Sequence, residues 1–210
     1  MSRFVPITPT LLAGRLARLL TERASPEHPV RFGVDAPACA AIGPLIGQLT
    51  ELLQAAGRPV AVVDSREFYR DASLRLEYGR TDVESFYSGW LDAAALQREV
   101  LSTLAVDGSY LPSLRDPVSN RSTRAERRTL PAQGVVLVTG ELLLGTGLAF
   151  DLVAHCAVSR QARRRRTPDE LQWTLPALDR YDIDVDPSAV ADVVIRYDDP
   201  AHPALLIRGQ

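Results

Sequence analysis

Apolar positions along the chain follow two kinds of spacing, one typical of helices and one typical of buried strands. Between residues 8 and 24, leucines recur three or four positions apart, which predicts an amphipathic helix. A second helix is expected from Pro44 to a stop at Gly57, and a third at residues 92–104. Five apolar runs predict strands, and the two at residues 59–64 and 134–140 lack polar alternation, as expected of strands buried on both faces. These runs cover residues 30–35, 59–64, 134–140, 152–158 and 191–196.

The order of these elements predicts the fold class. Strands alternate with helices, which favours an α/β fold with a mostly parallel five-stranded sheet and right-handed crossovers. A further apolar run at residues 203–207 can add a terminal strand. Residues 65–90 are polar and aromatic with little periodicity, so we interpret them as a functional loop. Residues 160–181 form a basic segment with helical spacing.

Length and composition limit the function classes. A chain of 210 residues with 46% hydrophobic residues fits a single domain over residues 1–210. The net charge of −2 and pI near 5.9 argue against nucleic acid or an anionic membrane as a partner. The start of the chain lacks the pattern of a signal peptide, so we expect a cytoplasmic protein. The two cysteines lie far apart, which predicts free thiols and no metal site.

The 24 positive residues are all arginines, and lysine is absent from the sequence. Codon bias in a GC-rich genome is the simple interpretation, and selection against reactive amines is the alternative. Either way, no lysine ammonium is available for binding a phosphate.

Several short segments form a recognisable series through their order and spacing. They are Phe32-Gly33-Val34-Asp35, Glu67-Phe68-Tyr69-Arg70, Tyr78-Gly79-Arg80, Ser85-Phe86-Tyr87, residues 135–143, residues 160–166, residues 175–181, Ala191-Asp192-Val193-Val194-Ile195 and Asp198-Asp199-Pro200. Together these segments resemble the uridine kinase family of P-loop nucleoside kinases, in particular its bacterial uridine-kinase-like branch. The resemblance runs over residues 8–207 and implies a three-layer P-loop kinase fold with a small lid at residues 160–181.

The phosphate-binding loop of that family reads G-x-x-x-x-G-K-S/T, in which the lysine reaches the outer phosphates and the hydroxyl ligates magnesium. Residues 36–43 occupy this position, and the four defining places hold Ala36, Ala41, Ile42 and Gly43. We therefore interpret the segment as a degenerate phosphate loop. No cofactor is predicted, since the residues that would hold ATP and magnesium are replaced.

Other positions matched by the resemblance have changed as well. Arg66 stands where the family carries an aspartate that acts as a base, and a guanidinium cannot accept a proton. Thr139 stands at the end of the Walker B strand, where an acidic residue is expected, and Gly89 replaces a further aspartate. Asp64 and Glu141 are the candidates to substitute for the base and for the metal-side acid.

Ligand-binding candidates follow from the same resemblance. Tyr69, Arg80 and Tyr87 stand where the family binds its nucleoside, although packing is an alternative role. Arg66 could bind an acidic group on a ligand or pair with a neighbouring carboxylate. Two arginines at the lid position, Arg163 and Arg164, match residues that approach phosphates in the family, and a solvated helix face is the alternative.

The catalytic residues are not identified by the sequence, and four candidates remain. Asp35, Asp64 and Glu141 follow strands at the carboxyl edge of the expected sheet, where such folds bind ligands. Cys39 precedes a helix, where a thiolate is stabilised, but a small buried residue is the simpler interpretation. His155 falls inside an apolar strand, where a core histidine is expected.

Three functional hypotheses remain open. The first is a protein that binds or transforms a small nucleoside-like or other polar metabolite without ATP. The second is a non-catalytic regulatory or interaction pseudokinase. The third is an active nucleoside kinase that uses arginines in place of lysine. The expected partner is a small molecule, and the resemblance also allows a homodimer.

Overall fold

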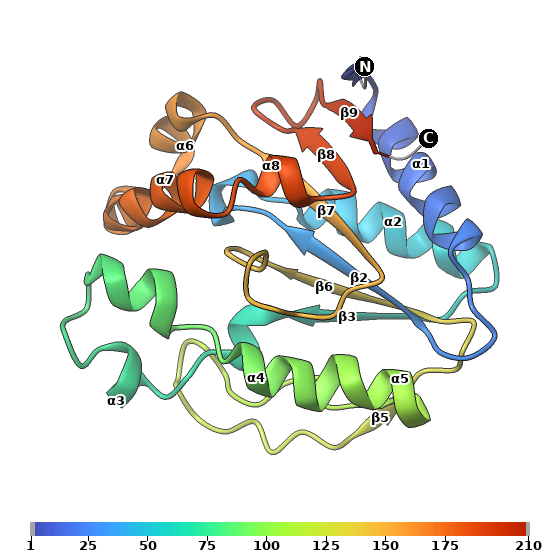
Figure 1. Ribbon diagram of the computed structural model, residues 1–210, viewed down its shortest axis with the longest axis horizontal. Coiled ribbons are helices and arrows are strands. Elements are labelled where there is room, and N and C mark those ends of the chain that lie inside the picture. The colour runs from blue at the N-terminus through green and yellow to red at the C-terminus, as the bar shows by residue number, and fades with distance from the viewer. Residues whose placement is uncertain (1–2, 209–210) are drawn as a thin grey trace.

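The computed structural model describes residues 3–208 and is built around a seven-stranded sheet (Figure 1). The order across the sheet is β1-β9-β8-β7-β2-β6-β3. The five strands from β8 to β3 are parallel, and β9 and β1 are antiparallel additions at one edge. The strand bounds are β1 Val5–Pro6, β2 Val30–Asp35, β3 Val60–Asp64, β6 Val135–Gly140, β7 Leu152–Ala157, β8 Val193–Arg196 and β9 Ala204–Ile207.

The α/β fold class predicted from the sequence is confirmed, but the strand number of five is corrected to seven. The five predicted strands form the parallel part of the sheet. The run at residues 203–207 becomes β9. Strand β1 is only two residues long and exposed, so no hydrophobic period marks it.

Helical segments connect the strands and cover both faces of the sheet. The α-helices are α1 Pro9–Glu22, α2 Gly43–Ala55, α3 Ala72–Arg75, α4 Ala93–Leu96, α5 Thr103–Asp107, α6 Arg160–Arg166, α7 Leu175–Asp184 and α8 Pro187–Val190. Shorter or wider turns are η1 Ala38–Ala40, η2 Ser65–Phe68, η3 Ser85–Gly89, η4 Gln97–Ser102 and η5 Asp169–Thr174, of which η3 and η4 are π-helical. A small hairpin pairs β4 Ser109–Tyr110 with β5 Arg128–Thr129.

Helix α1 matches the amphipathic helix expected near the N-terminus, with slightly shorter bounds. Its first turn is capped by Thr8, whose Oγ1 accepts the backbone N–H of Leu11 at 3.3 Å. Leu12, Leu16 and Leu20 recur at intervals of four residues and are buried. This leucine face packs with α2 against one face of the sheet, while α4, η4 and α5 cover the other face (Figure 1).

The basic segment at residues 160–181 is interrupted by an extended residue. Helix α6 ends at Arg166, and Thr167 is extended because the ring of Pro168 disfavours a helical conformation in the residue before it. The segment then continues through η5 into α7. Among residues 3–208, no helix is long and apolar enough to cross a membrane.

Strand register brings the candidate acidic residues to one edge. Strand β2 lies between β6 and β7, and Asp35 pairs in register with Gly140 on one side and with His155 on the other. Asp64 at the end of β3 pairs with Thr139 of β6. The carboxyl ends of β2, β3 and β6 therefore meet at the same edge, which is where ligands bind in open α/β sheets.

Candidate functional site

A cavity of about 390 Å³, which we name the loop cavity, opens at this edge between the ends of β2, β3 and β6. It contains three residues that the sequence singled out for their polar groups: Asp64, Arg66 and Glu141. Its walls are residues 36–38, 41–43 and 139–141 together with Ile46, Val62, Asp64 and Arg66. The structure thus brings the degenerate phosphate loop and these polar residues into one cavity.

The loop at residues 36–43 keeps a tight turn but directs several N–H groups toward its own chain. Ala40 and Ala41 donate their N–H groups to the carbonyls of Pro37 and Ala38, at 2.8 and 3.2 Å. The N–H of Ala38 is bound to the Glu141 carboxylate at 3.2 Å. Ala41 adopts a left-handed conformation with φ of 52°, which favours glycine. These three N–H groups are therefore not free to bind an anion.

Ile42, at the lysine position of the motif, also lines the loop cavity. Its aliphatic side chain packs partly against the main hydrophobic core. The end of β6 lies very close to η2. A Cβ added to Gly140 would be only 1.8 Å from the Oγ of Ser65. The floor of the cavity is thus apolar near Ile42 and closely packed near Gly140.

Glu141 has the most perturbed carboxyl group of the loop cavity. Burial raises its pKa to about 7, and the nearby charges of Asp35 and Asp64 act in the same direction. The hydrogen bond from Ala38 and the charge of Arg66 oppose this shift. A carboxyl group with this pKa exchanges its proton near neutral pH, as a general acid or base does.

Arg66 pairs with Asp64 on the same side of the cavity. Its Nη2 lies 2.6 Å from Oδ2 of Asp64, and its Nε lies 3.0 Å from the same oxygen. Of the two sequence interpretations of Arg66, the structure shows the ion pair. Because the Arg66 side chain is 58% exposed, the pair contributes little to stability.

A second cavity of about 230 Å³, which we name the aromatic cavity, adjoins the first at Glu141. Tyr69, Phe86, Tyr87 and Trp90 provide its aromatic walls. The π-helical turn η3 carries Phe86 and Tyr87, and turns of this kind are frequent at functional sites. Glu141 is thus the residue that the two cavities share.

Tyr69 and Tyr87 occupy different environments within this cavity. Burial raises the pKa of Tyr69, so its phenol stays protonated. The hydroxyl of Tyr87 donates to Asp184 at 3.1 Å, and the guanidinium of Arg180 lies 4.2 Å from the centre of its ring. Tyr87 therefore presents its ring to the cavity, because its hydroxyl is bound to Asp184.

Sequence reasoning missed Arg75 and Trp90. Arg75 is only 7% exposed, and its guanidinium lies 4.8 Å from the Trp90 ring centre and 5.6 Å from the Tyr69 ring centre. Burial lowers the pKa of Arg75. The indole Nε1 of Trp90 is buried without a hydrogen-bond partner among residues 3–208. The aromatic content of residues 65–90 was the available signal for Trp90, whereas Arg75 had none.

Other candidates lie outside the two cavities. Arg80 is exposed and lines neither of them, and Arg164 is exposed as well. Arg163 is buried and pairs with Asp179 and Asp182. Asp35, which is 1% exposed, bonds His155 instead of entering the loop cavity.

Cys39 is half-buried and packs against the main core, which fits the simpler of its two sequence interpretations. Gly89 ends the π-helical turn η3 and lines neither cavity. Within the described part of the chain, no group of three or more His, Cys, Asp or Glu side chains is arranged to hold a metal ion.

Comparisons with known proteins give a likeness in fold. No protein-family model and no curated protein matches the chain. A Bacillus stearothermophilus protein described as a possible uridine kinase matches it with a TM-score of 0.70 and 17% identity, over 87% of this chain and 96% of that one. A Silicibacter sp. TM1040 protein, provisionally described as a fructose transport system kinase, matches with a TM-score of 0.54 and 18% identity, over 84% and 89%. These two matches confirm the expected α/β fold with a mostly parallel sheet.

Proposed function

We propose that this chain binds a small, uncharged, nucleoside-like ligand in the joined loop and aromatic cavities and does not transfer phosphoryl groups from ATP. The charge balance of the loop cavity carries this proposal. Within residues 3–208, Arg66 is the single cation that lines it, and Asp64 pairs with that cation. Glu141 adds a second acidic group. A triphosphate with several negative charges would meet no net positive charge here.

The residues of the loop do not fit ATP and magnesium. A phosphate cradle needs free backbone N–H groups, a lysine and a hydroxyl that ligates the metal. Ala38, Ala40 and Ala41 already donate their N–H groups within the protein, and the sequence contains no lysine. One charge-assisted hydrogen bond contributes about 1.5–3 kcal/mol, so losing several removes most of the affinity for phosphates.

A neutral ligand with a flat ring and hydroxyl groups fits the same surfaces better. The aromatic walls formed by Tyr69, Phe86 and Trp90 suit the face of a planar base. Hydroxyl groups can donate to the carboxylates of Glu141 and Asp64. If the ligand is transformed, Glu141 is the group suited to move a proton, since its pKa of about 7 lies near physiological pH.

The other two hypotheses have less support from the side-chain contacts. An active kinase that uses arginines needs free guanidinium groups, yet Arg66 is paired with Asp64 and Arg163 with Asp182. A purely regulatory pseudokinase has no need of the aromatic cavity next to Glu141. No observation favours it over ligand binding.

Thermal unfolding with added ligands tests the proposal. Uridine and cytidine are compared with ATP, each with and without magnesium. A nucleoside present at about 100 times its dissociation constant stabilises the fold by about 2.7 kcal/mol. For a chain of this length that corresponds to a rise in Tm of roughly 5–10 °C. ATP is expected to give no magnesium-dependent rise.

A pair of variants separates cavity binding from unspecific effects. Val62 is 48% exposed and lines the loop cavity, so Val62→Trp should fill the cavity and reduce the nucleoside effect. Val106 is 85% exposed on α5, outside both cavities, and Val106→Trp is the matched control. Magnesium-dependent stabilisation by ATP together with formation of ADP would refute the proposal. Absence of any nucleoside effect would instead favour the non-catalytic regulatory or interaction pseudokinase.

A further inference from the structure

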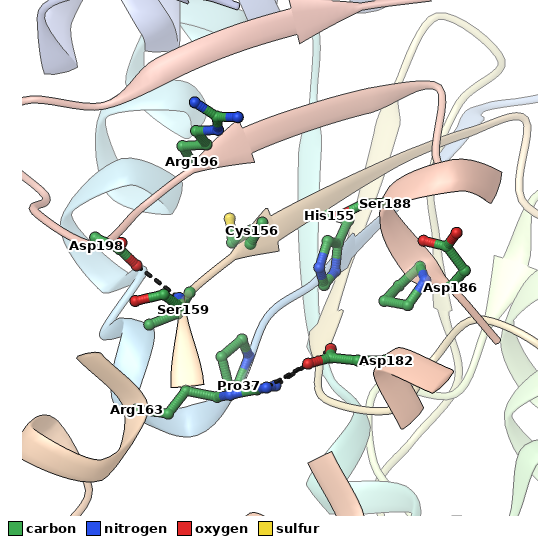
Figure 2. A pocket seen from close by; sticks show the side chains of 13 residues that line it. Pro37, His155, Cys156, Ser159, Arg163, Asp182, Asp186, Ser188, Arg196 and Asp198 are labelled. Carbon is green, nitrogen blue, oxygen red and sulfur yellow. Dashed lines mark hydrogen bonds and ion pairs between the residues drawn. The ribbon is translucent and has the colours of Figure 1, made fainter. Parts of the chain in front are cut away.

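A third cavity, of about 260 Å³, lies on the other side of the loop at residues 36–43 (Figure 2). Its walls come from the end of β7, from α6, α7 and α8, and from the segment that follows β8. Pro37 lines both this cavity and the loop cavity, so the loop separates the two spaces. We name it the His155 cavity after the histidine in its wall.

His155 is an unusual residue for the wall of a buried strand. It is 6% exposed, and its neighbours Ala154 and Cys156 are fully buried in the main core. Its Nδ1 lies 2.7 Å from Oδ2 of Asp35, which is 1% exposed. Burying two ionisable side chains is costly unless they are paired, as this carboxylate and this imidazole are.

The contact with Asp35 fixes the orientation of the imidazole. Oδ1 of Asp35 also accepts the N–H of Leu143 at 3.0 Å, so the carboxylate is held by two elements. A carboxylate only accepts, which places the proton of the ring on Nδ1 when the imidazole is neutral. No hydrogen-bond partner of Nε2 is present among residues 3–208. The ring therefore offers Nε2 as an acceptor at the cavity wall.

Two carboxylates in the cavity wall, those of Asp186 and Asp198, each have one oxygen that accepts no hydrogen bond from the described residues. Arg163 is paired with Asp182, as Figure 2 shows, so neither forms a free charge. One oxygen of Asp198 accepts the N–H of Ser159 at 2.6 Å, and one oxygen of Asp186 accepts the N–H of Ala189 at 3.2 Å. The second oxygen of each carboxylate has no partner in the described part of the chain.

From this geometry we infer that the His155 cavity binds a neutral polyhydroxy ligand of monosaccharide size. Hydroxyl groups donate to Nε2 of His155 and to the carboxylates of Asp186 and Asp198. The carboxylates of Asp186 and Asp198 disfavour an anion, because the one lining arginine without a carboxylate partner among the described residues, Arg196, stacks its guanidinium 4.0 Å from the centre of the Phe4 ring. The volume is smaller than that of a typical drug-sized site. The site is separate from the nucleoside-like site proposed above.

Nuclear magnetic resonance of the imidazole groups tests this inference, because the chain has only 3 histidines. The probes are D-ribose and D-glucose, added to the full-length protein at up to about 50 mM, which detects dissociation constants near or above 1 mM. The ring signals of His155 should shift in a saturable way. The signals of His28 and His202 should stay in place, since neither residue lines the cavity.

Assignment and controls use conservative variants. His155→Asn keeps a donor toward Asp35 but lacks Nε2, and it should abolish saturable binding in calorimetry. His202→Asn, a variant of a histidine that is 83% exposed, should bind as the unaltered protein does. If His155→Asn fails to fold, His28→Asn and His202→Asn assign the remaining signal in the unaltered protein by elimination.

The same titrations distinguish the two proposed sites. Saturable shifts of the His155 signals with a sugar, unaffected by Val62→Trp, support the inference whether or not nucleosides bind. Absence of a shift with both sugars, or a shift caused only by inorganic phosphate, would overturn it.

Discussion

The protonation of Glu141 gives the sharpest prediction for this site. Its pKa is raised from the usual 4.5 to about 7, so the folded protein binds this proton more tightly than the unfolded chain does. The free energy of unfolding must therefore fall as the pH rises from about 4.5 to about 7. A pKa shift of this size corresponds to about 3 kcal/mol of stability, fully present at low pH and lost above pH 7.

Replacing Glu141 with glutamine removes this titration. The amide oxygen can still accept the N–H of Ala38, which the carboxylate accepts at 3.2 Å in the unaltered protein. The variant should exceed the unaltered protein by about 1 kcal/mol at pH 5 and by about 3 kcal/mol at pH 8. For 210 residues this is a difference in Tm of roughly 5–10 °C.

The assay is thermal or urea unfolding of both proteins from pH 5 to pH 8. Only the difference between the two is compared, because other groups titrate in the same range. Glu51→Gln, at an exposed glutamate of α2, is the control and should leave the pH dependence unchanged. A difference between Glu141→Gln and the unaltered protein that stays constant across this range would refute the argument that burial destabilises the ionised form of Glu141.

Three further predictions concern the loop and the thiols. Gly140→Ala should lower the free energy of unfolding, measured in urea, by about 1–3 kcal/mol, since its Cβ would lie 1.8 Å from a side-chain oxygen of η2. Gly47→Ala is the control: it has open space around it in α2 and should raise the free energy of unfolding by about 0.5–1 kcal/mol. Ala41→Gly should gain about 0.5 kcal/mol in the same assay, because it relieves a φ of 52°, and a loss would contradict that view. In timed alkylation followed by mass spectrometry, Cys39 should react before Cys156, because Cys156 is fully buried and burial raises its pKa to about 12; equal rates would contradict this.

The parallel core of the fold could be predicted because doubly buried strands have an unmistakable composition. Val135 to Val138 are all fully buried, and their run of apolar residues marks β6 without any periodicity. The two strands at the sheet edge, β1 and β9, were not fully predicted, for different reasons. Strand β1 has too few residues for a pattern, and β9 could be placed only as an optional addition.

The loop cavity could be predicted in part, because strand order and strand ends fix where Asp64 and Glu141 lie. The spacing of residues along the chain does not show which side chains pair in the folded protein. The partners of Asp35 and Arg163 could therefore not be predicted. Both turn away from the loop cavity and pair with residues more than 15 positions away along the chain. The role of His155 in a cavity wall was hidden for the same reason.

Two arginines at the lid position, Arg163 and Arg166, are used as structural contacts, which bears on both proposed sites. Arg163 pairs with two carboxylates of α7, and Arg166 donates to the carbonyls of Ala40 and Tyr197 at 3.1 and 2.9 Å. These bonds join α6 to the loop and to the end of β8. Guanidinium groups held in this way would have to leave their partners before they could approach a phosphate, at a cost of about 1.5–3 kcal/mol for each charged hydrogen bond. A neutral ligand requires no such rearrangement, so the contacts that fix α6 favour uncharged ligands in the cavities on both sides of the loop.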